Sequence, residues 1–524
     1  MISVVDIFAG PGGLGEGFSS LRGSTNSIPF RVCVSIEKDL QATETLRLRS
    51  FFREFPDGQA PDEYYAHLRG EISRSELYEF FPKESARADT VAVNAELGSK
   101  EWSRARVRSL IQNALGKRKN FVLVGGPPCQ AYSIVGRSRN KGISGYEAET
   151  DKRSTLYKEY LRILADHQPG VFVMENVKGL VSAKLFKQRL FEKLLKDLMS
   201  PEKALKRGRG AARGGTKRLG YRLYSLVEPG VYQPGEDKNF VVDAERFGIP
   251  QARHRVIILG VREDLARAEP KQLSPVDEIP LMKVIGDLPK LRSGLSKVED
   301  SGDNWVSVLR SIRGEKWFRN GHLGDIAGDK LRPFMRDVLS NLKAQERGRG
   351  AEFVKTRTRN VRWNNEWFSD PHIRGVCNHA TKSHMEKDLH RYIYAASYAK
   401  VNGVSPNLRD FPLELLPDHK NVKLALANGN FSDRFRVQLA HKPATTITSH
   451  IGKDGHYYIH PDPAQARSLT VREAARIQTF PDSYFFCGPP TQQYKQVGNA
   501  VPPLLARQIA DIVFDVLKQA RIVR

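Results

Sequence analysis

Cysteine is scarce in this chain of 524 residues, and long apolar runs are missing. The four cysteines lie far apart, which excludes a disulfide framework and is typical of a reducing compartment. No segment approaches the ~18 apolar residues that a spanning helix needs, so we expect no membrane association. The first residues, MISVVDIFAG, lack the charged and apolar regions of a signal peptide, and we therefore expect a cytoplasmic protein.

The remaining composition is that of a globular protein with a surplus of positive charge. Hydrophobic residues make up 40% of the chain and charged residues 27%, which excludes disordered and collagen-like classes. The formal net charge is +24. Such a surplus favours a polyanionic partner, and nucleic acid is the first candidate.

A repeated pattern organises the first half of the chain. Short Val/Ile/Phe-rich runs alternate with glycine- or proline-containing turns and longer amphipathic stretches. This pattern predicts an α/β fold with a doubly wound, mostly parallel sheet. The predicted strands are Val4–Phe8, Arg31–Ile36, Thr90–Val93, Phe121–Val124, Val171–Met174, Leu223–Val227 and Val256–Val261.

The pattern is lost in the middle of the chain and resumes near its end. Residues 264–466 are irregular and hold four of the five tryptophans, so we predict a smaller module inserted between a catalytic domain at 1–263 and a C-terminal return at 467–524. Two further segments, 56–88 and the basic 201–220, also interrupt the α/β pattern, and their roles stay open.

A glycine-rich turn follows the first strand. In DIFAGPGGLGEGF, Gly10, Gly12 and Gly15 match G-x-G-x-x-G, and Glu37 ends the next strand, where an acidic side chain can bind ribose hydroxyls. The spacing fits NAD, FAD and S-adenosylmethionine about equally, and it also fits a tight strand-to-helix turn without a ligand.

Two further strands end in chemically distinctive residues. The strand at 121–124 leads into GGPPCQAYS, which places Cys129 at the carboxyl edge of the sheet, where a nucleophile is expected and a buried structural cysteine is not. The strand at 171–174 ends in Glu175-Asn176, which can deliver a carboxyl group to the same edge or simply cap the next helix.

A third segment, QARHRVIILGVR, carries Gln251, Arg253 and Arg255 at alternate positions entering a strand. Alternate residues share one face of a strand, so this row is expected to bring a cation to the pocket, although a solvated edge would have the same pattern. The loop after Cys129, SIVGRSRNKGISGY, is rich in glycine and basic residues, a composition that a merely solvated loop would share.

In their order, these motifs resemble those of the DNA (cytosine-5) methyltransferases. The matching blocks are DIFAGPGG, SIEKD, GGPPCQ, MENV, QARHR, RSLTVREAARIQTFPD and QVGNAVPP. The resemblance implies a fold of the class I methyltransferase type, with the module at 264–466 as the target-recognition domain. It further implies S-adenosylmethionine as cofactor, no metal, and double-stranded DNA as substrate.

The resemblance also implies roles for individual residues. Cys129 would add to C6 of a flipped cytosine, Glu175 would hold N3, and Arg255 would bind the O2 side, with Gln251 and Arg253 completing the catalytic set. The expected cofactor-binding residues are Phe8, Gly10, Gly12, Gly13, Leu14, Glu37, Pro127, Asn499 and Val501. The expected DNA-contacting residues are Gln130, Ser133, Arg137, Arg139, Lys442 and Thr446. The residue that contacts adenine stays open among Asp89, Asn94 and Glu96.

The resemblance favours a monomeric bacterial modification enzyme at the nucleoid, working beside a restriction endonuclease. A tRNA cytosine-5 methyltransferase and a catalytically silent DNA-binding relative are the alternatives, and a nucleotide oxidoreductase has only the glycine spacing in its favour. Between His372 and His390, a Cys-x-His-x4-His spacing matches no standard zinc pattern, and His384 and His390 are expected in an amphipathic helix.

Overall fold

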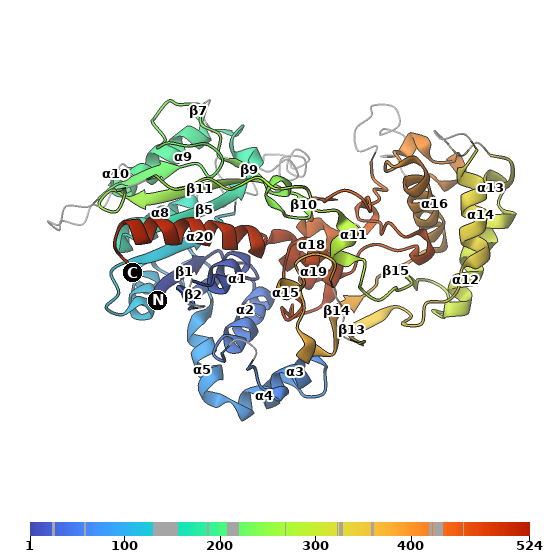
Figure 1. Cartoon of the computed structure of the whole chain (residues 1–524), viewed down its shortest axis with the longest axis horizontal. Helices are drawn as coiled ribbons and strands as arrows, with labels where there is room; N and C mark the ends of the chain where they lie inside the picture. Colours follow the sequence, from blue (N-terminus) through green and yellow to red (C-terminus); the bar gives the residue numbers. More distant parts are fainter. Residues whose placement is uncertain are drawn as a thin grey trace. The chain divides into compact units, whose positions relative to one another are not determined.

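The structure is a computed structural model in which two compact units are described separately (Figure 1). It describes residues 1–23, 27–56, 59–128, 156–185, 188–206, 219–267, 269–321, 323, 329–357, 361–418, 422, 433–453 and 455–523. Unit 1 comprises residues 1–59, 78–277 and 500–524, and unit 2 comprises residues 60–77 and 278–499. No helix within these described ranges is both long and apolar enough to cross a bilayer.

Unit 1 is built on a mixed sheet that runs in the order β3-β2-β1-β4-β5-β11-β8, with β9 paired to β11 as well. The strands are β1 (Ile2–Ile7), β2 (Phe30–Glu37), β3 (Ala92–Asn94), β4 (Phe121–Gly125), β5 (Val171–Val177), β8 (Tyr221–Tyr224), β9 (Val241–Asp243) and β11 (His254–Arg262). β1 to β5 are mutually parallel, so their carboxyl ends meet at one edge. All seven predicted strands overlap an observed one, and the predicted mostly parallel α/β sheet is confirmed.

The strand β11 departs from the parallel pattern. It lies antiparallel to β5, β8 and β9, so it begins at the edge where β5 ends. Sequence periodicity cannot reveal this direction, because a buried strand has the same apolar pattern either way. The strand β9 is missing from the prediction because three residues are too short for an alternation to be visible.

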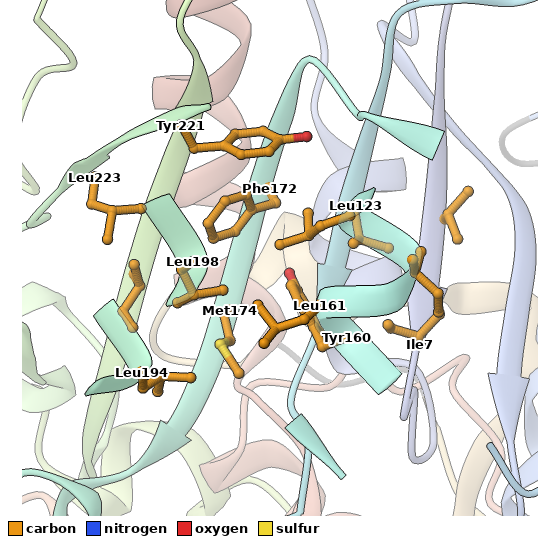
Figure 2. Close-up of a cluster of buried hydrophobic side chains, with 14 of the residues drawn as sticks. Ile7, Leu123, Tyr160, Leu161, Phe172, Met174, Leu194, Leu198, Tyr221 and Leu223 are labelled. Atoms are coloured by element: carbon orange, nitrogen blue, oxygen red, sulfur yellow. The ribbon is translucent and has the colours of Figure 1, made fainter. Parts of the chain in front are cut away.

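Helices cover both faces of the unit 1 sheet (Figure 1). They are α1 (Gly13–Ser20), α2 (Leu40–Phe52), α5 (Pro82–Val91), α6 (Arg104–Leu115), α8 (Tyr157–His167), α9 (Leu190–Met199), α10 (Pro201–Lys206) and α20 (Pro503–Gln519). Figure 2 shows the core under α8 and α9, where Tyr160, Leu161, Leu194 and Leu198 pack on side chains of the sheet such as Phe172. Burying each such side chain contributes roughly 1.5–3 kcal/mol.

The opposite face is closed by α1 and α20. Phe30 of β2 packs edge-to-face against Phe18 of α1 and against Phe514 of α20. The two helices approach closely because a Cβ on Gly17 would lie 2.4 Å from the Cβ of Ala506. The C-terminal helix therefore packs against the second strand and the first helix of the same unit.

Unit 2 is mainly helical and carries short strand pairs. Its helices are α3 (Asp62–Leu68), α11 (Leu281–Ile285), α12 (Gly302–Arg310), α13 (Lys316–Asn320), α14 (Leu331–Asn341), α15 (Asn365–Phe368), α16 (Glu386–Asn402), α18 (Val471–Ile477) and α19 (Pro490–Asn499). Its strand pairs include β13 (Gly350–Lys355) with β14 (Gly375–Ala380), and β12 (Gly294–Leu295) with β15 (Ser383–His384). Trp305, Trp317 and Tyr394 lie in its core, so two of the four tryptophans of this segment serve packing.

Three buried arginines bind the segment after residue 466 into unit 2. Arg467 donates to the carbonyl of Leu291 at 3.2 Å, Arg472 donates to the carbonyl of Cys377 at 2.9 Å, and Arg476 pairs with Asp287 at 2.6 Å. All three side chains are at most 1% exposed. Of the segment 467–524, residues 467–499 belong to unit 2 and residues 500–524 to unit 1, and the chain passes from unit 1 to unit 2 after residue 277.

Residues 60–77 leave the sheet unit and pack within unit 2. Tyr64 and Tyr65 of α3 are 1% and 2% exposed. The Tyr64 hydroxyl donates to the carbonyl of Ser483 at 3.4 Å, and the Tyr65 ring stacks on His372. The helix α4 (Arg74–Phe80) then leads the chain back. Within the 56–88 interruption, residues 60–77 thus belong to the second unit, into which α3 buries two tyrosines.

Substitution of Gly17 by Ala tests the contact between α1 and α20. In an open helix this change would be favourable, but here the new methyl group meets Ala506 and the carbonyl of Pro503, 2.5 Å away. We expect a loss of roughly 1–3 kcal/mol in the free energy of unfolding, measured by urea denaturation. Gly314→Ala is the control, because a Cβ there meets nothing within 4 Å. Equal stability of the two variants would contradict the close packing.

Candidate active site

The glycine-rich turn after β1 has a strained backbone. Phe8, Gly10 and Gly12 have φ of 53°, 55° and 92°. For Phe8 this left-handed conformation costs of the order of 1 kcal/mol, and such strain is concentrated at functional sites. Gly12 can adopt it without penalty and forms the N-cap of α1. Gly13 and Leu14 follow at the first two positions of α1, where backbone N–H groups have no partner within the helix, which suits a polar ligand.

Glu37 joins this turn to the end of β2. Its carboxylate accepts from Gly10 N at 2.9 Å and from Asp39 N at 2.8 Å. Burial raises the pKa of Glu37. The predicted pair of Gly10 and Glu37 is therefore brought together by a direct hydrogen bond.

Asn94 ends β3 directly beside Glu37, its register partner. Its amide nitrogen donates to the carbonyls of Glu37 and Lys38 and to Thr43 Oγ1, at 3.1–3.2 Å. Of the residues left open for an adenine contact, Asp89 lies in α5 and pairs with Arg47 at 2.7 Å, and Glu96 pairs with Lys38 at 3.6 Å. Asn94 is thus the candidate that sits at the carboxyl edge of the sheet.

The C-terminal segment packs against the first residue of α1. A Cβ on Gly13 would lie 2.1 Å from the carbonyl oxygen of Val501, so only glycine fits there. Leu14 is buried at 6% exposure, which leaves its backbone as the part that can face a ligand. Asn499, predicted beside Val501, belongs to unit 2 and is exposed at the end of α19.

The turn before the predicted nucleophile needs its two glycines. A Cβ on Gly125 would lie 2.4 Å from the carbonyl of Ile7, and one on Gly126 would lie 2.6 Å from Glu175 Oε2. Asn176 Nδ2 donates to the carbonyl of Pro127 at 3.0 Å and so stabilises this turn, whereas the N-cap of the next short helix is Val177 and not Asn176. Cys129, Gln130, Ser133, Arg137 and Arg139 lie outside the described residues.

Glu175 and Arg255 form the charged centre of the site. The antiparallel register aligns Glu175 with Ile257 and Val177 with Arg255. Arg255 Nε lies 3.0 Å from Glu175 Oε1, and the two side chains are 15% and 14% exposed. Burial lowers the pKa of Arg255, and Glu175 opposes this shift. The predicted carboxyl group and cation therefore meet at the end of β5.

Gln251 and Arg253 lie outside the strand that carries Arg255. Gln251 is in β10 (Gln251–Ala252), and Arg253 N donates back to the carbonyl of Gln251 at 2.8 Å, so this stretch is a tight turn. Both side chains are buried, at 0% and 2% exposure. The expectation that all three side chains share one strand face is wrong, because β11 begins only at His254.

Two of the other thiols are unsuited to nucleophilic attack. Burial raises the pKa of Cys33 to about 11 and that of Cys377 to about 12, so both stay protonated at neutral pH. Cys33 Sγ donates to the carbonyl of Val4, within the sheet. These thiols therefore do not compete with Cys129 for the nucleophile role.

The predicted DNA contacts within the described residues belong to unit 2. Lys442 is exposed, and Thr446 is half-buried with its carbonyl accepting from the Tyr458 hydroxyl at 3.1 Å. Nothing in these contacts identifies DNA as a ligand, so both roles stay predictions.

The histidines between 372 and 390 serve the interior of unit 2. His379 binds Thr470 Oγ1 at 2.9 Å, His384 binds Ser293 Oγ at 2.7 Å, and His390 binds the carbonyl of Val308 at 2.9 Å. Burial lowers the pKa of His379 to about 4 and that of His384 to about 3. His384 lies in β15, not in the expected helix. Within the described part of the chain no group of His, Cys, Asp and Glu is arranged to hold a metal.

Asp6 was not singled out from the sequence, although it opens the glycine motif. It is fully buried in β1, and its carboxyl group faces the backbone N–H of Gly15. A Cβ on Gly15 would lie 3.0 Å from Asp6 Oδ2, which places the carboxyl group under the first turn of α1. Burial raises the pKa of Asp6 to about 7. Asp6 is distinguished only by its burial among elements that are distant in sequence, and no local sequence pattern predicts that burial.

Asp6→Asn should change the pH dependence of stability. The folded protein holds this proton up to about pH 7, whereas the unfolded chain releases it near 3.8, so this group lowers the free energy of unfolding as pH rises through that window. Between pH 5.5 and 8 we expect wild type to lose roughly 2 kcal/mol more than the variant, measured by urea denaturation. Parallel pH curves for the two proteins would contradict a neutral buried Asp6.

Comparisons with known proteins agree on one family. The model of the family described as C-5 cytosine-specific DNA methylase matches residues 107–201 and 232–515. The type II methyltransferase M.Bpa9945I of Bacillus paralicheniformis is 32% identical over 98% of this chain and 99% of its own. The DNA (cytosine-5-)-methyltransferase M.ApeKI of Aeropyrum pernix is 29% identical over 76% and 81%, and the type II methyltransferase M.DdeI of Desulfomicrobium norvegicum is 25% identical over 74% and 71%.

Proposed function

This chain belongs to the C-5 cytosine-specific DNA methylase family and is a DNA (cytosine-5-)-methyltransferase, and we propose that it acts through a covalent bond between Cys129 and the target cytosine. The methyl donor would be S-adenosylmethionine, and the target a flipped cytosine in a specific double-stranded sequence. The observation that carries the proposal is the ion pair of Glu175 and Arg255 beside the turn that leads to Cys129.

The residues of the turn after β1 fit this donor. Gly13 and Leu14 stand at the first two helical positions of α1, where backbone N–H groups have no partner within the helix, and Glu37 would offer a carboxylate for the ribose. When bound, S-adenosylmethionine supplies a methyl group from a sulfonium that departs as a neutral thioether.

The chemistry requires activation of the ring, because C5 of cytosine is a weak nucleophile. The thiolate of Cys129 forms a bond to C6 and pushes the ring electrons toward C5, while Glu175 holds a proton at N3. Arg255 balances charge on the O2 side. After C5 is methylated, loss of its proton and expulsion of the Cys129 thiolate restore the aromatic ring.

The names of the relatives support a place in restriction–modification. M.Bpa9945I and M.DdeI are type II methyltransferases, and we propose that this chain likewise protects a sequence from a restriction endonuclease. The target-recognition role proposed for residues 264–466 rests on the position of this segment within the chain.

Parallel assays of methyl transfer to unmethylated DNA and to tRNA test whether DNA is the substrate. Labelling of tRNA alone would contradict the proposed methylation of DNA.

Cys129→Ser should abolish methyl transfer to DNA while leaving S-adenosylmethionine binding within a few-fold of wild type. The sulfur acts on the base, so cofactor affinity measured by calorimetry does not depend on it. Cys33→Ser is the matched control, since this thiol stays protonated inside the sheet, and it should keep full activity. Undiminished turnover in Cys129→Ser would refute the covalent mechanism.

A further inference from the structure

His254, the residue of QARHR without an assigned role, lies between two carboxylates. The antiparallel pairing of β9 with β11 makes Asp243 its register partner, and Nδ1 lies 3.4 Å from Asp243 Oδ1. Its Nε2 lies 2.7 Å from Oε1 of Glu245, in the short helix Ala244–Phe247. Glu245 is 14% exposed and His254 35%, so solvent screens these contacts only in part.

The backbone fixes the partners of His254 in place. Ala244 N donates to the carbonyl of Arg253 at 3.1 Å, and Ile257 N donates to the carbonyl of Phe240 at 3.0 Å. These bonds hold the segment that carries both carboxylates along the beginning of β11. Strand pairing therefore places both carboxylates beside the His254 side chain.

His254 is also connected to the charged centre of the site. Its carbonyl accepts from Arg255 Nη1 at 2.8 Å, and Nε of the same guanidinium lies 3.0 Å from Glu175 Oε1. The guanidinium plane is thus defined by two partners, the His254 peptide and Glu175. A shift of that peptide would rotate Arg255 and leave Glu175 differently oriented.

We propose that His254, Asp243 and Glu245 form a positioning element, the His254 clamp, that holds Arg255 and through it Glu175 in the orientation needed for attack on cytosine. The inference rests on the proposed function, because it assigns the clamp to that same reaction. A metal role does not fit, since no described group is arranged as a metal site. The clamp touches neither cofactor nor base and acts through Arg255 alone.

The experiment compares His254→Ala, His254→Gln and Glu245→Ala in the full chain, with steady-state kinetics of tritiated methyl transfer to unmethylated DNA. A displacement of ~1 Å at a reacting group can cost up to about 100-fold in rate. We expect His254→Ala to lower kcat by at least ~10-fold, with KM for S-adenosylmethionine and for DNA within about threefold. The amide of His254→Gln can still donate to Glu245 and should recover most of the loss.

Two comparisons separate positioning from a loss of structure. His167→Ala is the matched control, a half-buried histidine at the end of α8 in the same unit, and it should leave kcat unchanged. The double variant His254→Ala with Glu245→Ala should be no slower than His254→Ala alone, because Glu245 acts only through His254. Glu175→Gln gives the reference for losing the carboxylate itself.

The possible outcomes distinguish a failure of the His254 clamp from a failure of the proposed function. Active wild type with unchanged kcat in His254→Ala, additive losses in the double variant, or a loss in KM alone would each overturn the clamp while leaving the proposed function intact. A wild-type enzyme that transfers no methyl group to DNA would overturn the proposed function and the clamp with it.

Discussion

The antiparallel pairing of β11 with β5 is the constraint on which the site depends. Because β5 ends where β11 begins, Glu175 and Arg255 reach the same edge of the sheet and form an ion pair at 3.0 Å. A parallel β11 would carry its first residues to the opposite edge. Both groups are largely removed from water, so each would be costly to bury without the other, and the pairing of the strands keeps them together.

Glycines allow the remaining parts to approach this edge. Gly126 leaves room for the Glu175 side chain, and Gly125 leaves room for the end of β1. In α1, Gly13 and Gly17 let the C-terminal segment that holds Val501 and Ala506 pack closely on this helix. Glycine is thus required in the turn after β4, at the start of α1 and where α20 packs on α1. At each of these places a Cβ would meet backbone or a neighbouring side chain.

Local patterns predict the parts of this site that are encoded by neighbours in sequence. The turn around Gly10, the position of Glu37 at the end of the next strand, and the edge position of Glu175 follow from strand-turn spacing alone. Features set by long-range packing were not predictable: the buried Asp6, the pairing of Asp243 with His254, and the inclusion of residues 60–77 and 467–499 in the second unit. A helix pattern tells which face is buried, but not which unit buries it.

The account rests on a covalent bond between Cys129 and cytosine C6, and trapping tests it most directly. DNA containing 5-fluorocytosine cannot lose a proton from C5, so the bond would persist once the ring is methylated. The account predicts an enzyme–DNA adduct that withstands denaturation, needs S-adenosylmethionine, and maps to the peptide of Cys129 by mass spectrometry. Methylation of ordinary DNA without such an adduct, or an adduct at another residue, would contradict it.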